Sequence, residues 1–163
     1  MTLTNATATE TRERLAGARG EGPSKVYGAG EPRVGAVADS RSLIKPVVLR
    51  GADASVQGAL KISPANGALF AWEKKGTYAE WTLPDDMVPG EYEVVLHCSA
   101  AEGEGGSFDV SLGDDQVLSA TIGGEGEWND WRDFHAGNIK VAAKGGTLRV
   151  TATALSNVRL MNL

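Results

Sequence analysis

Residues 91–98 read EYEVVLHC, a short run that alternates between two kinds of side chain. Successive residues of a β-strand point to opposite sides, so the second, fourth, sixth and eighth residues of this run share one face. That face consists of Tyr92, Val94, Leu96 and Cys98. Residues 108–112, FDVSL, repeat the pattern and are followed by the turn sequence GDD. The two runs predict strands that each bury one side.

Further short runs follow one another from residue 44 onwards, separated by Gly, Pro, Asp and Asn. Turn signals recur roughly every 8–12 residues, and no convincing helix follows residue 45, which is typical of a sandwich. The sequence therefore predicts an all-β fold, an antiparallel β-sandwich. We expect its strands at residues 46–50, 60–62, 78–83, 91–98, 108–112, 117–122, 132–141, 147–153 and 158–163.

The chain changes character near residue 46. Residues 1–46 hold seven Lys or Arg and five Asp or Glu, whereas residues 47–163 hold nine and sixteen, so a net +2 precedes a net −7. Large apolar side chains are sparse in the first part, although Thr9–Ala18 could form a short helix. We predict an N-terminal arm over residues 1–46, extended or partly helical, and a β-sandwich over residues 47–163. The arm is either a disordered tail or a segment that packs on a neighbouring subunit.

Composition excludes several classes of partner. The 163 residues carry a formal net charge of −5, which gives no electrostatic footprint for nucleic acid or an anionic membrane. No apolar run approaches the roughly 18 residues that span a bilayer. Residues 1–16 lack the apolar core of a secretion signal, so we expect a cytoplasmic protein or one released as part of a virion or other particle.

Motifs for catalysis are also missing. The sequence holds no G-x-S-x-G, P-loop or H-E-x-x-H pattern, and Cys98 is the only cysteine. Pairs of neighbouring acids occur at residues 85–86, 102–104, 114–115 and 130–133, where solvated turns, calcium binding and catalysis are the alternatives. His97 and Cys98 are neighbours in one strand and point to opposite faces, so they cannot form a local nucleophile–base pair, and His135 has no evident partner. We therefore predict that the protein is not an enzyme.

The four tryptophans form two pairs in the sequence, Trp72 with Trp81 and Trp128 with Trp131. The position of Trp81 in an alternating run indicates core packing. Trp72 and Trp128 adjoin polar loop sequences, where a large exposed aromatic is costly unless it binds something. The apolar C–H face of a sugar ring stacks on indole, so these two side chains are candidates for glycan binding. The alternative is that each closes one end of the core.

Seven segments, in this order along the chain, resemble a known family. They are residues 49–58 (LRGADASVQG), 72–81 (WEKKGTYAEW), 89–96 (PGEYEVVL), 105–112 (GGSFDVSL), 126–131 (GEWNDW), 145–150 (GGTLRV) and 154–159 (ALSNVR). Together they resemble the galactose-binding-like β-sandwiches, or jelly rolls, of carbohydrate-binding module families six and thirty-five. The version at the C-terminus of bacterial sulfatases and other secreted glycan-degrading enzymes is especially similar. The resemblance covers residues 47–163.

The resemblance implies a sugar cleft in the loops at one end of the sandwich. Its binding residues correspond to Trp72, Trp128 and Asn157, and Glu73 or Glu127 would bond sugar hydroxyls. Tyr78 takes the place of a tryptophan that is structural in the family, and Glu127 replaces a loop glycine.

The resemblance also bears on a metal. The first strand of the family supplies a glutamate ligand for a structural calcium, and Ala52 stands at that position here. We therefore expect no cofactor, with Asp53 as a possible substitute ligand if calcium is bound.

Two functions follow from this sequence. The first is a non-catalytic carbohydrate-binding module whose partner is a glycan. The second is a structural decoration subunit of a viral capsid or tail, or of another large assembly, anchored through residues 1–46 as a homo-oligomer. The second is favoured by the lack of a catalytic domain and a signal peptide, by Ala52, and by the N-terminal arm. The two functions are compatible, since a surface protein of a particle can hold glycans.

Overall fold

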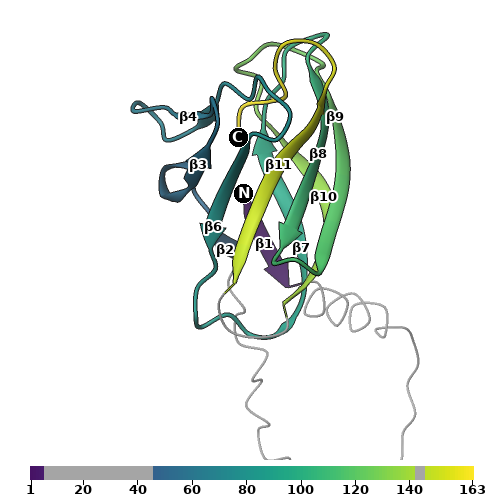
Figure 1. Cartoon of the computed structure of the whole chain (residues 1–163). Helices are drawn as coiled ribbons and strands as arrows, with labels where there is room; N and C mark the ends of the chain where they lie inside the picture. The colour runs from purple at the N-terminus through teal and green to yellow at the C-terminus, as the bar shows by residue number, and fades with distance from the viewer. Residues whose placement is uncertain (6–45, 142–145) are drawn as a thin grey trace, which may run out of the picture.

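The computed structural model describes residues 1–5, 46–141 and 146–163 of the chain. In these ranges the chain is built from short and medium β-strands and one turn of 3₁₀-helix, η1 (Gly51–Asp53) (Figure 1). The strands are β1 (Thr2–Asn5), β2 (Val47–Val48), β3 (Ser55–Gln57), β4 (Lys61–Ile62), β5 (Leu69–Phe70), β6 (Tyr78–Thr82), β7 (Gly90–Cys98), β8 (Gly105–Leu112), β9 (Gln116–Gly123), β10 (Arg132–Val141) and β11 (Thr147–Leu155).

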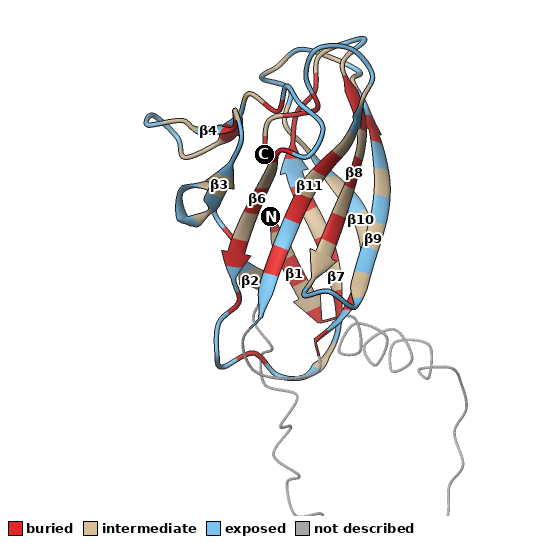
Figure 2. Ribbon diagram, in the orientation of Figure 1, coloured by how far each residue is buried: buried red, intermediate tan, exposed pale blue. Residues whose placement is uncertain are grey.

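The longer strands form two antiparallel sheets that face each other across a hydrophobic core. One sheet has the order β10-β7-β1-β2 and the other the order β3-β6-β11-β8-β9, while β4 and β5 form a separate hairpin. Buried residues alternate with intermediate or exposed ones along β7 and β11, and Figure 2 shows this alternation on β11. The antiparallel β-sandwich predicted from the sequence is therefore confirmed.

Strand β7 has the inward face that its alternation predicts. The side chains on this face are at most 1% exposed, and they are Tyr92, Val94, Leu96 and Cys98. Strand β10 pairs with β7 along its whole length, with a bulge between His135 and Gly137. The opposite sheet supplies Phe108 and Val110, which are completely buried.

The first residues of the chain belong to the sandwich. Strand β1 lies between β7 and β2, with Thr2 opposite Val95 on one side and Val48 on the other, and Leu3 is completely buried. For residues 1–5 the predicted arm is therefore wrong, because four residues are too few for their alternation to stand out in the sequence. Residues 6–45, which include the expected helix at Thr9–Ala18 and the contact with a neighbouring subunit, lie outside the described residues.

The last six residues do not form the strand predicted at residues 158–163. This segment crosses the end of the sandwich, where Asn162 forms an isolated bridge with Ser99 and Leu163 exchanges backbone hydrogen bonds with Leu69. Leu160 and Met161 are buried, so the segment closes the core at this end. The segment thus pairs with two separate parts of the chain, at Ser99 and at Leu69, and does not form the continuous ladder of a strand.

A side chain links the two sheets at one open edge. Gln116 of β9 donates from its amide to the carbonyl of Lys140 on β10 at 2.6 Å, and accepts from the Lys140 N–H at 2.7 Å. The side-chain amide of Gln116 thus makes the pair of hydrogen bonds that a neighbouring strand would make.

Among the described residues, no helix is long and apolar enough to cross a membrane.

Candidate functional site

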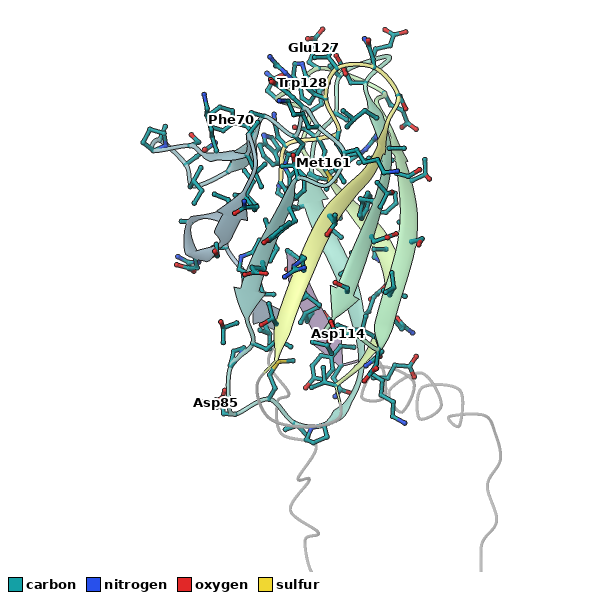
Figure 3. The ribbon with its side chains drawn as sticks, in the orientation of Figure 1. Phe70, Asp85, Asp114, Glu127, Trp128 and Met161 are labelled. Atoms are coloured by element: carbon teal, nitrogen blue, oxygen red, sulfur yellow. The ribbon has the colours of Figure 1, made fainter. Side chains whose placement is uncertain are left out.

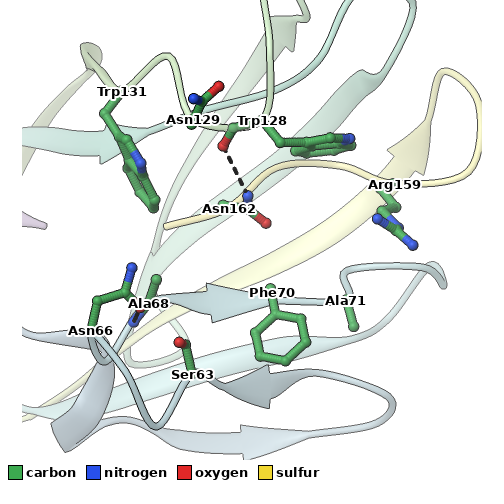
Figure 4. Close-up of a pocket in the computed structure, with 10 residues that line it drawn as sticks. All are labelled: Ser63, Asn66, Ala68, Phe70, Ala71, Trp128, Asn129, Trp131, Arg159 and Asn162. Atoms are coloured by element: carbon green, nitrogen blue, oxygen red, sulfur yellow. Dashed lines mark hydrogen bonds between the residues drawn. The ribbon is translucent and has the colours of Figure 1, made fainter.

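A cleft of about 500 Å³ opens at one end of the sandwich, opposite the end that carries Asp85 and Asp114 (Figure 3). The β4–β5 hairpin forms one wall, the loop between β9 and β10 forms the other, and the C-terminal segment runs between them (Figure 4). The large aromatic residues of its lining are Phe70, Trp128 and Trp131. The polar ones are Ser63, Asn66, Asn129, Arg159 and Asn162. Both the volume and this mixture of residues are typical of small-molecule sites.

The loop that carries the two tryptophans has a fixed shape. A side chain at Gly124 would place its Cβ 1.7 Å from the carbonyl oxygen of Ala101, so only glycine fits there. Further along, the carboxylate of Asp130 accepts the backbone N–H of Glu127 at 2.8 Å, which closes the loop tip into a turn. The glycine-rich sequence thus serves close packing of the loop on the chain preceding β8.

Trp128 is fixed through its backbone, while its ring remains partly exposed at the cleft. Its carbonyl oxygen accepts hydrogen bonds from the buried hydroxyl of Ser99 at 2.7 Å and from the side-chain amide of Asn162 at 3.3 Å (Figure 4). The guanidinium carbon of Arg159 lies 5.8 Å from the centroid of the indole. A cation at this distance from an aromatic ring is weakly attracted to it.

Arg159 is held by two acids. Its Nε donates to the carboxylate of Glu73 at 3.3 Å. The carboxylate of Glu104 accepts the backbone N–H groups of Val158 and Arg159 at 3.0 and 2.7 Å. These contacts fix the C-terminal segment where it enters the cleft. They also balance the positive charge that Arg159 brings to the lining.

Trp131 is supported from outside the cleft. The imidazole of His97 stacks on its indole, with 5.6 Å between the ring centroids and 18° between the ring planes. The Nδ1 atom of His97 lies 2.8 Å from a carboxylate oxygen of Asp133. Asp133 and His97 are paired across β10 and β7, so the sheet sets the position of the imidazole.

The predicted binding residues do not all reach this cleft. Trp128 lines it, and Glu73 acts on it through Arg159. Glu127 and Asn157 are exposed and do not contribute to the lining. In Figure 3 Glu127 lies beside Trp128 at the end of the sandwich.

The prediction that Trp72 stacks on a sugar is wrong. Trp72 is completely buried, and its Nε1 has no hydrogen-bond partner among the described residues. Simple alternation from the buried Leu69 would point Trp72 outwards, but Ala71 adopts a positive φ of 66°, which interrupts the extended backbone that alternation requires. The carbonyl of Trp72 then accepts the N–H of Leu160 at 3.0 Å. Trp72 therefore closes the end of the core, which was the alternative interpretation.

The family calcium does not fit the residues found here. Asp53 is exposed on η1, beside Ala52. The part of the chain that the structure describes holds no group of three acidic, histidine or cysteine side chains that could bind a metal. Calcium takes six to eight oxygen ligands, several of them carboxylates in most sites. Asp53 alone does not supply such a set.

Several cleft residues were missed by the sequence analysis, namely Asn66, Phe70, Asn129, Trp131, Arg159 and Asn162. Trp131 was visible as the second half of a tryptophan pair next to a polar loop. Phe70 is an aromatic residue close to a turn, which is a weaker indication of a binding residue. The asparagines and Arg159 become cleft residues only when three distant segments meet, which no local pattern indicates.

No protein-family model matches the sequence, and no curated protein matches it either. Solved structures do match the fold. A family 35 carbohydrate-binding module from Clostridium thermocellum aligns with a TM-score of 0.58 at 16% identity, over 72% of this chain and 96% of that one. The C-terminal family 6 module of a marine laminarinase from Zobellia galactanivorans aligns with a TM-score of 0.50 at 17% identity, over 67% and 84%.

A larger enzyme contains the same fold as one of its parts. The GH26-CBM35 β-(1,4)-mannanase of Podospora anserina aligns with a TM-score of 0.52 at 13% identity, over 70% of this chain but only 26% of the mannanase chain. At these identities the likeness establishes the fold. The sandwich has the same fold as these modules of families six and thirty-five, as the resemblance in the sequence predicted.

Proposed function

We propose that this protein is a non-catalytic carbohydrate-binding module that holds a glycan in the cleft at the end of the sandwich. The observation that carries the proposal is the composition of that cleft, where Phe70, Trp128 and Trp131 lie among asparagines and one arginine. The solved structures with this fold named above are or contain carbohydrate-binding modules, which supports the proposal.

The chemistry of a sugar matches such a lining. One face of a pyranose ring is made of C–H groups and gains dispersion and desolvation energy by stacking on an aromatic ring. Its hydroxyls need both donors and acceptors at its edge. The side-chain amides of Asn66, Asn129 and Asn162 offer both, while Arg159 offers donors only.

The fixed positions of the two tryptophans support binding without rearrangement. The Trp128 backbone is held by Ser99 and Asn162, and the Trp131 ring is held by His97. A site that is formed before the ligand arrives spends less of its interaction energy on ordering side chains. A single shallow cleft nevertheless binds weakly, so we expect useful retention to come from several copies on one surface.

The test is binding of the full chain to an array of polysaccharides and oligosaccharides. The wild type should be retained on at least one glycan, and Trp128→Ala should lose that retention. The matched control is Tyr78→Ala, since Tyr78 is also a partly exposed aromatic under an arginine, with the Arg149 guanidinium carbon 4.3 Å from its ring centroid. Absence of wild-type binding to every glycan, or equal loss in both variants, would overturn the proposal.

The alternative of a decoration subunit on a capsid, tail or other assembly depends on the N-terminal segment. Residues 6–45 lie outside the described part of the chain, and residues 1–5 belong to the sandwich. The alternative is therefore a separate prediction. Deleting residues 6–45 should then abolish an assembly seen by electron microscopy and leave glycan binding intact.

A further inference from the structure

A second hollow, of about 640 Å³, adjoins the cleft on the far side of Trp131. Asn66, Ala68 and Trp131 line both spaces, so the two lie next to each other at the turn of the β4–β5 hairpin. In Figure 4 the indole of Trp131 extends from its loop towards Asn66 and Ala68. Trp131 is thus a wall that the cleft and the second hollow share.

The second hollow combines the same kinds of surface as the cleft. Its buried apolar residues are Met1, Leu49 and Leu163. The charged or amide side chains of its lining are Arg50, Asn66 and His97, and no Asp or Glu occurs among the described residues that line it. A few polar groups over an apolar base are what a site for a hydroxyl-rich ring requires.

The shared wall is rigid because His97 covers part of it. The stacked imidazole lies on the side of the second hollow and is tied to β10 by Asp133. A ligand chain that crosses Trp131 would therefore meet a fixed aromatic ridge. It would also meet Asn66 on the opposite side of the groove, within reach of both spaces.

We propose that the cleft and the second hollow are two parts of one groove, and that the ligand is an internal stretch of an oligosaccharide lying across Trp131. This inference rests on the proposed function, because it assigns a second subsite to the same glycan. A single terminal sugar would fill only the cleft. Successive sugar units of one chain would occupy both spaces, with the linkage passing over Trp131 and beside Asn66.

Val48 offers a way to block the second hollow alone. It lines that hollow but not the cleft, and it is 59% exposed on β2. A tryptophan in its place would fill the second hollow from the side. Ala52→Tyr is a second obstruction, because Ala52 is an exposed lining residue of the same hollow on η1. The matched control is Val117→Trp, since Val117 is 57% exposed on β9 and lines neither space.

The experiment is isothermal titration of the full chain with manno-oligosaccharides and with ladders from any polysaccharide that the array identifies, from monosaccharide to hexasaccharide. For the wild type, affinity should rise at least about tenfold between the shortest and the longest bound member. Val48→Trp and Ala52→Tyr should remove that gain and leave the affinity for the shortest member unchanged. Val117→Trp should behave as wild type.

The outcomes separate the two proposals. If the wild type binds short and long members equally and Trp128→Ala abolishes binding, the cleft is a glycan site but the two-part groove is wrong. The same holds if both obstructing variants fold, by thermal unfolding, and retain the full gain with chain length. If the wild type binds no glycan on the array or in titration, the proposed function and this inference both fail.

Discussion

The imidazole of His97 and the indole of Trp131 lie nearly parallel, with 5.6 Å between their centroids, although the two residues come from different elements. Strand β7 supplies His97, and the loop preceding β10 supplies Trp131. The contact links the outward face of one sheet to the wall of the cleft. It explains how a side chain on an irregular loop keeps one orientation.

Removal of this support should weaken glycan binding. An aromatic pair contributes about 0.5–1.5 kcal/mol, so we expect His97→Ala to lower affinity roughly two- to tenfold without unfolding the protein. The control is His135→Ala, because the two histidine side chains are 62% and 64% exposed and each pairs with a carboxylate. Titration with the same glycan checks this. Equal affinities for the two variants would show that Trp131 needs no support from His97.

Strand β1 should be essential to the stability of the sandwich. Leu3 is completely buried between the sheets, and truncation of a buried leucine to alanine costs about 2–5 kcal/mol. We therefore expect Leu3→Ala to lower the free energy of unfolding by that amount in urea, whereas Thr4→Ala, on the outward side of β1, should cost much less. If both variants unfold at the wild-type midpoint, β1 does not pack as described.

The single cysteine should make stability fall at high pH. Burial raises the pKa of the Cys98 thiol to about 11, from its ordinary value of 9.0. Between these two values the unfolded chain loses a proton that the folded chain keeps. The contribution of the thiol is thus fully present below pH 9 and declines by roughly 1.4 kcal/mol for each pH unit above it.

Urea unfolding of the wild type and Cys98→Ala, each near neutral pH and near pH 11, measures this effect. Other groups titrate in the same range, so the difference between the two proteins is the informative quantity. We expect the wild type to lose about 2 kcal/mol more than the variant. Identical losses would mean that the thiol ionises as freely in the folded protein as in the unfolded one.

Calcium should have no effect on folding. Ala52 stands where the resemblance implies a glutamate ligand, and the described residues hold no group of three acids, histidines or cysteines that could bind a metal with Asp53. A ligand that binds only the folded state raises the melting temperature. We therefore expect the same melting temperature with added calcium chloride and with a chelator. A rise with calcium that Asp53→Ala abolishes would show that Asp53 does hold the metal.

The fold was largely predictable because alternation is strong in the longer strands. The run at residues 91–98 has a buried residue at every second position, and β7 follows it with one additional residue. The short strand β1 was not predicted, because it pairs with β7, which lies about 90 residues further along the chain. The C-terminal segment was wrongly predicted as a strand. Its apolar residues are buried because they close the core, and they form no continuous ladder.

The binding site was less predictable than the fold. A tryptophan beside a turn can point either way, and the positive φ of Ala71 decided the direction of Trp72. Trp128 has a similar local sequence context, but Ser99 and Asn162 hold its backbone at the rim of the cleft. Both outcomes depend on tertiary contacts, so the sequence alone could propose the pair but could not distinguish its members.

The most direct test of glycan binding in the cleft is calorimetric titration of Trp128→Ala with a glycan that the wild type binds. We expect at least a tenfold loss of affinity, equivalent to about 1.4 kcal/mol or more, with an unchanged melting temperature. Under the same conditions Tyr78→Ala should bind as tightly as the wild type. Wild-type affinity in the folded Trp128→Ala variant would show that the glycan is not bound in this cleft.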